Sequence, residues 1–371
     1  MNLSYWEYKT WLSNLDAVII GSGIVGLTCA IAYKKKHPSK KVLILERGLL
    51  PQGASTKNAG FACFGSVSEL LDDLNTHTEE EVIELVQQRF EGIQHLRAYL
   101  GDQVLDYQPW GGYELFQEKD KELFESCLDR FRGINALLKP VFGEAIFSIQ
   151  QNEFGFKNVL PQYMFNAAEG QLDTGKMMQA LLQKAQQLGI IILNGISVTD
   201  FEDSGSQVTI KTEQFECTAQ HLFIATNGFA AQLGLETVKP ARAQVLITKP
   251  IDNLNIQGTF HLDKGYYYFR NIDHRILLGG GRNLDFKAEE TTELSQTALV
   301  QHTFEELLAT VILPDQKYQI DHRWSGIMGV GAQKKPVIKQ LSNHVFCGVR
   351  LGGMGVAIGS SVGKKLCELA T

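Results

Sequence analysis

Residues 21–26 read GSGIVG, a spacing of glycines that lets a backbone approach a phosphate group closely. A strand-like apolar run, residues 16–20, precedes them, and a helix-like stretch, residues 27–36, follows. Glycine motifs are common, but this position between a strand and a helix is typical of a dinucleotide site. A second apolar run ends at Glu46, which lies 20 residues after the last glycine of the motif.

Each residue of this pattern has a physical role. Gly21 allows the tight turn, Gly23 admits a pyrophosphate, and Gly26 lets helix and strand pack closely. The phosphates lie at the helix N-terminus, where free N–H groups and the positive dipole end favour an anion. Glu46 can accept hydrogen bonds from ribose hydroxyls and would repel a 2′-phosphate. The motif therefore predicts NAD or FAD; the alternative is a buried βαβ unit that binds nothing.

Composition excludes several classes of protein. A 44% hydrophobic and 20% charged chain of 371 residues is typical of a globular protein with about two domains or one composite domain. The net charge of −6 predicts no nucleic-acid partner, and no apolar window approaches membrane-spanning length. The six cysteines are scattered without metal-ligand spacing, which predicts no metal site and free buried thiols in a reducing, cytoplasmic compartment.

The order of elements predicts the architecture. Helices are expected near residues 68–74, 79–99, 119–138, 171–188, 295–310 and 360–369, and alternating strands near residues 110–116, 244–248, 265–270 and 275–278. Parallel-type elements occur at both ends and in the middle, with antiparallel elements between them. We expect an α/β fold: a discontinuous Rossmann-like dinucleotide-binding domain with an inserted α+β substrate domain built on an antiparallel sheet. The expected segments are 1–75, 151–236 and 321–371 for the first domain, and 76–150 and 237–320 for the second.

Further motifs separate the two cofactors. Residues 52–66 read QGASTKNAGFACFGS, residues 225–228 read ATNG, and residues 240–244 carry P-x-R-x-Q. Residues 324–326 read WSG, with a proline downstream, and residues 347–366 read CGVRLGGMGVAIGSSVGKKL. In this order and spacing the chain resembles the D-amino-acid oxidase-like flavoproteins, which include glycine and sarcosine oxidases, over nearly its whole length. The resemblance implies FAD, bound non-covalently because the W-x-G segment has no cysteine for a covalent link.

The first motif and the resemblance together give the residues expected to hold FAD. They are Gly21, Ser22, Gly23, Ile24, Val25, Gly26, Glu46, Arg47, Ala54, Ser55, Thr56, Lys57, Asn58, Ala59, Gly60, Val198, Ala225, Thr226, Asn227, Gly326, Leu351, Gly352, Gly353, Met354 and Gly355. The last glycine cluster lies between a strand and an apolar helix, where backbone N–H groups can face the flavin. Without the resemblance it is a tight turn that needs positive φ.

Substrate-facing residues are expected on the inserted sheet and the closing loop. Tyr266, Tyr268 and Arg270 alternate along one strand and so share a face. An arginine there, or Arg350 in the closing loop, can hold a carboxylate with a bidentate fork. The alternative is that Arg270 forms a surface salt bridge and the tyrosines pack in the core.

The chain departs from the family at two positions. Glycine-oxidase relatives place a carboxylate-binding arginine where Met328 stands, so the clamp comes from Arg270 or Arg350, or the substrate lacks an α-carboxylate. Sarcosine-oxidase relatives use an oxygen-activating lysine where Leu277 aligns. Lys57 is the nearby cation that the sequence offers, and both oxygen and another electron acceptor stay open.

The resemblance therefore predicts an FAD-dependent oxidoreductase that acts on a C–N bond of a small amino acid or secondary amine. In this reaction a hydride passes to flavin N5 and the resulting imine is hydrolysed. A 2-hydroxy acid is the alternative substrate, and a modified tRNA base is disfavoured by the acidic chain. A non-catalytic flavin-binding redox sensor and an NAD-dependent dehydrogenase are the rivals from other classes.

Overall fold

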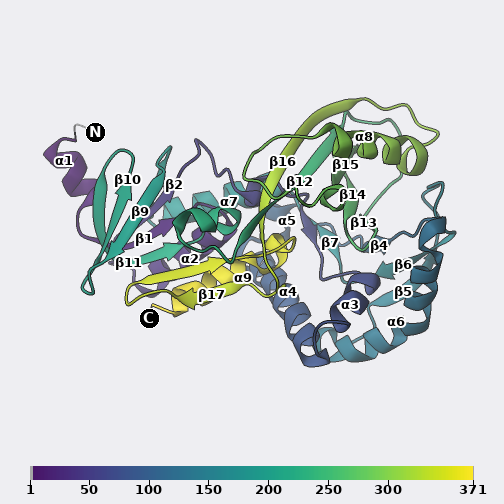
Figure 1. Cartoon of the computed structure of the whole chain (residues 1–371), viewed down its shortest axis with the longest axis horizontal. Helices are drawn as coiled ribbons and strands as arrows, with labels where there is room; N and C mark the ends of the chain where they lie inside the picture. The colour runs from purple at the N-terminus through teal and green to yellow at the C-terminus, as the bar shows by residue number, and fades with distance from the viewer. Residues whose placement is uncertain (1–2, 371) are drawn as a thin grey trace.

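The computed structural model describes residues 3–370, which form an elongated molecule with one large sheet toward each end (Figure 1). The first sheet has eight strands in the order β17-β18-β11-β1-β2-β8, with β10 paired to β11 and β9 paired to β10. Its strands are β1 (Leu15–Ile20), β2 (Val42–Glu46), β8 (Ile191–Asn194), β9 (Val198–Asp203), β10 (Val208–Thr212), β11 (Glu216–Ile224), β17 (Val337–Gln340) and β18 (Val345–Val349).

Parallel pairing at the centre of this sheet identifies the dinucleotide-binding half. β1 pairs in parallel with β2 and β11, and β11 pairs in parallel with β18. Alternate residues of β1 enter opposite cores, with Ala17 and Ile19 on the helix-covered face and Val18 and Ile20 on the other. The helices that pack together on that face are α2 (Ile24–Lys36), α4 (Glu79–Leu100), α7 (Thr174–Gln187) and α9 (Gly355–Glu368).

The second sheet also has eight strands, in the order β16-β12-β15-β14-β13-β4-β6-β5, and it is antiparallel except where β13 meets β4. Its strands are β4 (Gly112–Glu114), β5 (Phe147–Gln151), β6 (Gln162–Asn166), β12 (Lys239–Thr248), β13 (Thr259–Leu262), β14 (Tyr267–Ile272), β15 (Arg275–Gly280) and β16 (Ile320–Val330). Phe260 and Phe269 stack in the core beneath α8 (Ala298–Leu307) on one face of it. The alternate residues of the same strands face the other way, toward the first sheet.

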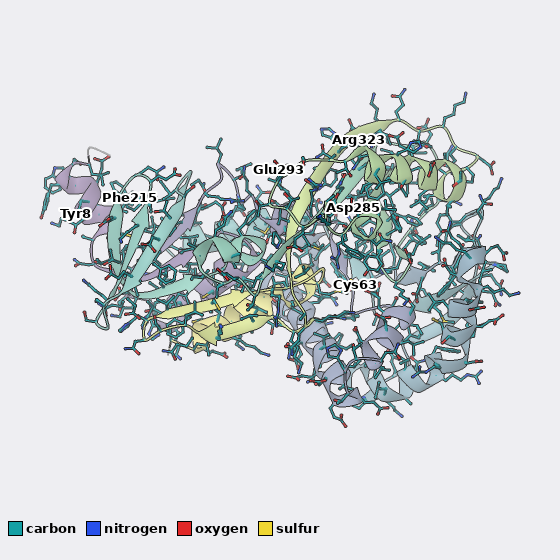
Figure 2. The ribbon with its side chains drawn as sticks, in the orientation of Figure 1. Tyr8, Cys63, Phe215, Asp285, Glu293 and Arg323 are labelled. Atoms are coloured by element: carbon teal, nitrogen blue, oxygen red, sulfur yellow. The ribbon has the colours of Figure 1, made fainter. Side chains whose placement is uncertain are left out.

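Shorter elements complete the chain. They are α1 (Tyr5–Glu7), α3 (Val67–Leu74), α5 (Asp102–Leu105), α6 (Lys121–Phe142), β3 (Phe61–Ala62) and β7 (Gly170–Gln171). Local residues set both ends of α4. At its start, the Thr78 hydroxyl accepts a hydrogen bond from the backbone N–H of Glu81, and at its end the chain leaves the helix at Gly101, which adopts a positive φ. The segment of residues 5–11 near the N-terminus contains four exposed aromatic residues. It projects from one end of the molecule, where Tyr8 is 51% exposed (Figure 2). Among residues 5–12, only Leu12 is buried.

The predicted fold is confirmed: a Rossmann-like parallel sheet is joined to an antiparallel sheet by a chain that crosses between them repeatedly. Some bounds differ. The strand expected over residues 110–116 is limited to β4, and the last helix begins at Gly355 rather than at residue 360. We propose the division into domains that the sequence predicts, with two changes. The expected first domain included β6 and most of β16, but both strands belong to the second sheet and so to the second domain. Within residues 3–370, no helix combines the length and apolar character that crossing a membrane requires.

Candidate active site

One cavity of about 810 Å³ is lined from both sheets and runs from the glycine motif to the inner face of β14. Every residue predicted to hold FAD lines it, except Ser22, Gly26, Thr56 and Gly60. A cavity of this size and shape, with one end at a helix N-terminus, fits a large elongated ligand. The four exceptions have supporting positions, which are described below.

The glycine motif shapes the first end of the cavity. Gly21 has φ +101°, and a Cβ there would lie 2.9 Å from the Ala225 carbonyl oxygen. A Cβ on Gly26 would lie 1.9 Å from the Gly21 carbonyl oxygen, so only glycine allows the first turn of α2 to pack on this loop. At Gly23 the nearest atom to an added Cβ is the hydroxyl oxygen of Ser55, at 2.8 Å. That hydroxyl accepts a hydrogen bond of 3.0 Å from the Ile24 N–H and closes the phosphate-facing turn.

Glu46 lies at the carboxyl end of β2 and is 5% exposed, on the cavity wall. One carboxylate oxygen accepts hydrogen bonds from the N–H and hydroxyl of Ser22, at 3.0 and 2.7 Å, and the other accepts from the Gly48 N–H at 3.0 Å. Ser22 is thus buried behind the wall, where it orients Glu46. Beside them Arg47 stacks on Phe229, 3.7 Å from the ring centroid, and burial lowers the arginine pKa.

The loop that follows β2 is held against the second sheet. Trp324 Nε1 donates a 2.9 Å hydrogen bond to the Lys57 carbonyl oxygen, and a Cβ on Gly326 would lie 3.1 Å from Lys57 Cβ. Asn58 Oδ1 accepts from the Gly60 N–H at 2.8 Å, and the Thr56 hydroxyl donates to the Pro51 carbonyl oxygen. Thr56 and Gly60 therefore shape this loop without lining the cavity.

The closing loop brings further backbone to the same cavity. Asn227 has φ +44°, and its Oδ1 accepts a 3.1 Å hydrogen bond from the Leu351 N–H. Arg350 has φ +65°, and its Nε donates 3.0 Å to the Lys335 carbonyl oxygen. The Thr226 hydroxyl is buried at the cavity wall without a hydrogen-bond partner among residues 3–370. An unpartnered donor, close-packed glycines and a buried Glu46 together fit an adenine dinucleotide.

Aromatic side chains form the opposite end of the cavity. Tyr268 on β14 lies directly opposite His261 on β13, so both side chains point into the cavity. The Phe61 ring contacts both edge-on, with centroids 5.4 Å from His261 and 5.5 Å from Tyr268. Gly279 makes room for the tyrosine, since a Cβ there would lie 2.6 Å from its ring. Burial raises the pKa of Tyr268 to about 12, so its hydroxyl is protonated at neutral pH.

A buried ion pair supports this wall. His261 Nε2 lies 3.0 Å from a carboxylate oxygen of Glu169, and the two side chains are 7% and 1% exposed. Burial disfavours a charged imidazole, but the charge and hydrogen bond of Glu169, with the charges of Glu69 and Glu114, raise the pKa of His261 to about 9. Cys63, labelled in Figure 2, lies nearby with its Sγ 3.7 Å from Met354 Sδ, and burial raises its pKa.

The structure corrects the role expected for Arg270. Its Nη1 donates hydrogen bonds to the carbonyl oxygens of Gly60 and Leu172, at 3.1 and 2.8 Å, and the side chain does not reach the cavity wall. Burial lowers its pKa to about 10. Arg270 therefore joins β14 to the loop before β3 and to the chain after β7, which rules out both the carboxylate clamp and the surface salt bridge in this structure. Tyr266 and Arg350 do line the cavity.

Several residues of the cavity wall were missed from the sequence, namely Phe61, His261, Arg89 and Arg282, as was Glu169 behind it. A usable signal existed for His261: the sequence DKG at residues 263–265 predicts a hairpin turn that pairs His261 with Tyr268. Arg89 lies on α4, and its buried Nε has no hydrogen-bond partner among residues 3–370. No local pattern distinguishes it from any other helical arginine.

Comparison with known proteins places the chain among flavoenzymes. The profile of the FAD dependent oxidoreductase family, DAO, matches residues 16–369. The probable oxidoreductase OrdL of Rhizobium meliloti (strain 1021) is 24% identical over 375 residues, which cover 96% of this chain and 82% of that protein. Glycine oxidase from Bacillus cereus ATCC 14579 superposes with a TM-score of 0.77 at 15% identity, over 96% of this chain and 94% of that chain. L-proline dehydrogenase from P. horikoshii gives a TM-score of 0.75 at 18% identity, over 96% and 93%.

The family match spans almost the whole chain, and the glycine turn and Glu46 both line the cavity. The resemblance read from the sequence is confirmed. The chain belongs to the FAD-dependent oxidoreductase family, and it is an enzyme with FAD as its cofactor.

Proposed function

We propose that this enzyme oxidises the C–N bond of a small amino acid or secondary amine. The proposal is supported by the side chains that line the end of the cavity far from the glycine motif. There Tyr268, His261 and Phe61 line the cavity together, with the Phe61 ring in contact with the other two. The names of the structural relatives, a glycine oxidase and an L-proline dehydrogenase, favour amino-acid substrates for the same fold.

In this reaction the substrate loses a hydride from its α carbon and a proton from its nitrogen, and water hydrolyses the imine to a carbonyl compound and an amine. Bound FAD supplies the two-electron acceptor, at flavin N5. The protein residues supply position and surroundings. The rings of Phe61 and Tyr268 exclude water from one side of the substrate, and the Tyr268 hydroxyl, protonated at neutral pH, can donate a hydrogen bond to it.

At the cofactor end of the cavity, different residues would bind different parts of FAD. The turn at Gly21 and Gly23 would hold the phosphates of FAD, and Glu46 would hold the ribose. Residues 351–355 and Gly326 also line the cavity. We propose non-covalent attachment, since the W-x-G segment has no cysteine, and a cytoplasmic location, since the six cysteines are free and buried. Lys57 lines the cavity and is our candidate for influencing the reaction with oxygen or another acceptor.

The test is anaerobic reduction of the bound flavin. The visible spectrum of purified protein is recorded, followed by addition of amino acids, N-methyl amines and 2-hydroxy acids, one at a time. Bleaching by an amine supports the proposal and identifies the substrate, while bleaching by hydroxy acids alone replaces it with C–OH oxidation. If no compound bleaches the flavin and a protein partner binds only one redox form, a redox sensor replaces both. Release of yellow cofactor by acid precipitation tests non-covalent binding.

A further inference from the structure

A single row of residues crosses the second sheet on its cavity face. Residues paired across adjacent strands share a face, and the pairing runs from Trp324 through Val245, Gly279, Tyr268 and His261 to Glu114. The members near β16 are apolar or glycine, whereas His261 and Glu114 are ionisable and buried. The row therefore changes from an apolar floor to a charged end within one layer of side chains.

Glu169, the partner of His261, occupies space that a side chain at position 112 would fill. Glu169 lies in the turn after β6, and a Cβ on Gly112 would lie 2.0 Å from its Oε2. The same oxygen accepts from the Thr259 hydroxyl at 3.2 Å and meets His261 Nε2 at 3.0 Å, and the other oxygen accepts from Asn166 Nδ2 at 3.3 Å. Three strands, β4, β6 and β13, thus hold this carboxylate in one place, and the carboxylate orients the imidazole in turn.

Other charges near His261 are already engaged. Glu69 on α3 accepts a hydrogen bond from the Ser66 N–H at 2.9 Å. Glu114 on β4 accepts from the hydroxyls of Ser66 and Ser68 and from the Ser68 N–H. Cys63, whose pKa burial raises, remains a neutral thiol at neutral pH. The imidazole uses Nε2 for Glu169, which leaves Nδ1 as the ring nitrogen available to a ligand in the cavity.

We propose that His261, oriented by Glu169, is a substrate-binding residue that donates a hydrogen bond from Nδ1 to the carboxylate of an amino-acid substrate. The proposal deepens the proposed function and rests on it. It gives the chain a cationic donor that neither Met328 nor Arg270 supplies. Because the ion pair keeps the imidazole protonated, the donor is present through neutral pH and is lost as pH rises through about 9.

The experiment measures binding of acetate and of its neutral analogue, acetamide, to the FAD-loaded protein by calorimetry and by perturbation of the flavin spectrum. His261→Gln is the main variant, because a glutamine amide can keep the hydrogen bond to Glu169 while losing the Nδ1 donor. We expect acetate binding to weaken about 10-fold or more at neutral pH, since a charge-assisted hydrogen bond is lost. Acetamide binding should change by less than about 3-fold, because no charge attraction is lost with it.

Two further variants separate substrate binding from structure. His221→Gln makes the same substitution on β11, outside the cavity, and should leave acetate binding unchanged. Glu169→Gln removes the charge that raises the pKa of His261, so acetate affinity should fall at lower pH than in the unmodified enzyme. That shift, unlike a loss of stability, follows only from a change in imidazole protonation.

The unmodified enzyme gives an independent test. Its acetate affinity should be constant between about pH 6 and pH 8, where acetate is ionised, and then weaken about 10-fold per pH unit above about pH 9. An affinity that is flat across this range, an absence of acetate binding, or equal weakening of acetate and acetamide in His261→Gln overturns the proposal. These results are distinct from failure of the proposed function, which shows itself as a flavin that no amine reduces.

Discussion

The two ends of the cavity are formed by different parts of the chain, one mainly by backbone and the other mainly by side chains. At the cofactor end, the decisive groups are backbone atoms and absent side chains: Gly21, Gly23 and Gly26 allow contacts that a Cβ would block. At the other end, which we propose binds the substrate, the cavity is lined by side chains such as His261 and Tyr268, placed by strand register. The first end depends on a short stretch of chain. The second depends on several segments meeting, so the two should respond differently to substitution.

The largest expected effect tests the backbone-built end. Gly26→Ala places a Cβ 1.9 Å from the Gly21 carbonyl oxygen, which cannot move without opening the turn. We expect the free energy of unfolding to fall by about 3 kcal/mol or more, with loss of bound FAD. Flavin content and thermal unfolding measure this. Gly133→Ala in α6 is the control and should be neutral or stabilising, because apart from the adjacent backbone of α6 nothing among residues 3–370 lies within 4 Å of the added Cβ. If the Gly26→Ala protein binds FAD at full occupancy, the cofactor end does not depend on the absence of a side chain at position 26.

The next effect concerns Arg270, which joins the two ends. Arg270→Met removes both hydrogen bonds to the carbonyl oxygens of Gly60 and Leu172. We expect unfolding to become easier by about 2–3 kcal/mol, and KM to change equally for carboxylate and uncharged amines. Thermal unfolding and steady-state kinetics measure the two effects. Arg282→Met, on the cavity wall, is the control for loss of an arginine and should spare stability. A KM change confined to carboxylates would restore Arg270 as a substrate ligand.

A smaller effect sharpens the cofactor end, where one side chain does matter. Glu46→Gln keeps the shape of the side chain but removes its charge, so the charge-assisted hydrogen bonds to the ribose weaken. We expect FAD affinity to fall by about 1–3 kcal/mol, measured by titrating the apoprotein with FAD. Glu202→Gln on β9, outside the cavity wall, should leave the affinity unchanged. Equal affinities for the Glu46→Gln and unmodified proteins would remove the ribose role.

The smallest effect tests the side-chain-built end alone. Gly279→Ala brings a Cβ within 2.6 Å of the Tyr268 ring, which must swing toward the substrate. The cost should be about 1 kcal/mol, seen as a roughly 5-fold fall in kcat/KM with FAD content unchanged. Loss of FAD instead would show that the two ends are coupled more tightly than their construction indicates.

This difference in construction also sets how far the sequence could predict the site. The turn at residues 21–26 and the distance to Glu46 are local features, so the sequence could indicate that these segments line one cavity, while their roles toward FAD stay predictions. Alternation correctly put Tyr268 and Arg270 on one face, but the strand pattern does not show where the cavity stops along that face. Arg270 lies two residues further along β14, opposite Thr259, where it bonds to the chain next to β3 and β7.

Glu169 shows the other limit of the sequence. It precedes β7 in a turn, and nothing near it in the sequence marks it as a partner for a histidine 92 residues later. The space it occupies exists because position 112 is a glycine, which is equally remote in sequence. Such a pair follows from the register of β4, β6 and β13 and becomes visible only once those strands are aligned.

The alternation of the second sheet has a consequence for how such an enzyme can change. On β12, Ala243 and Val245 face the cavity while Leu246 enters the core beneath α8, and on β14 Tyr268 faces the cavity while Phe269 enters that core. Selection can therefore alter the cavity-facing positions one at a time while the core that holds the sheet together stays intact. For laboratory evolution this defines a compact library, in which new substrate preferences are sought at alternate positions and the intervening residues are left unchanged.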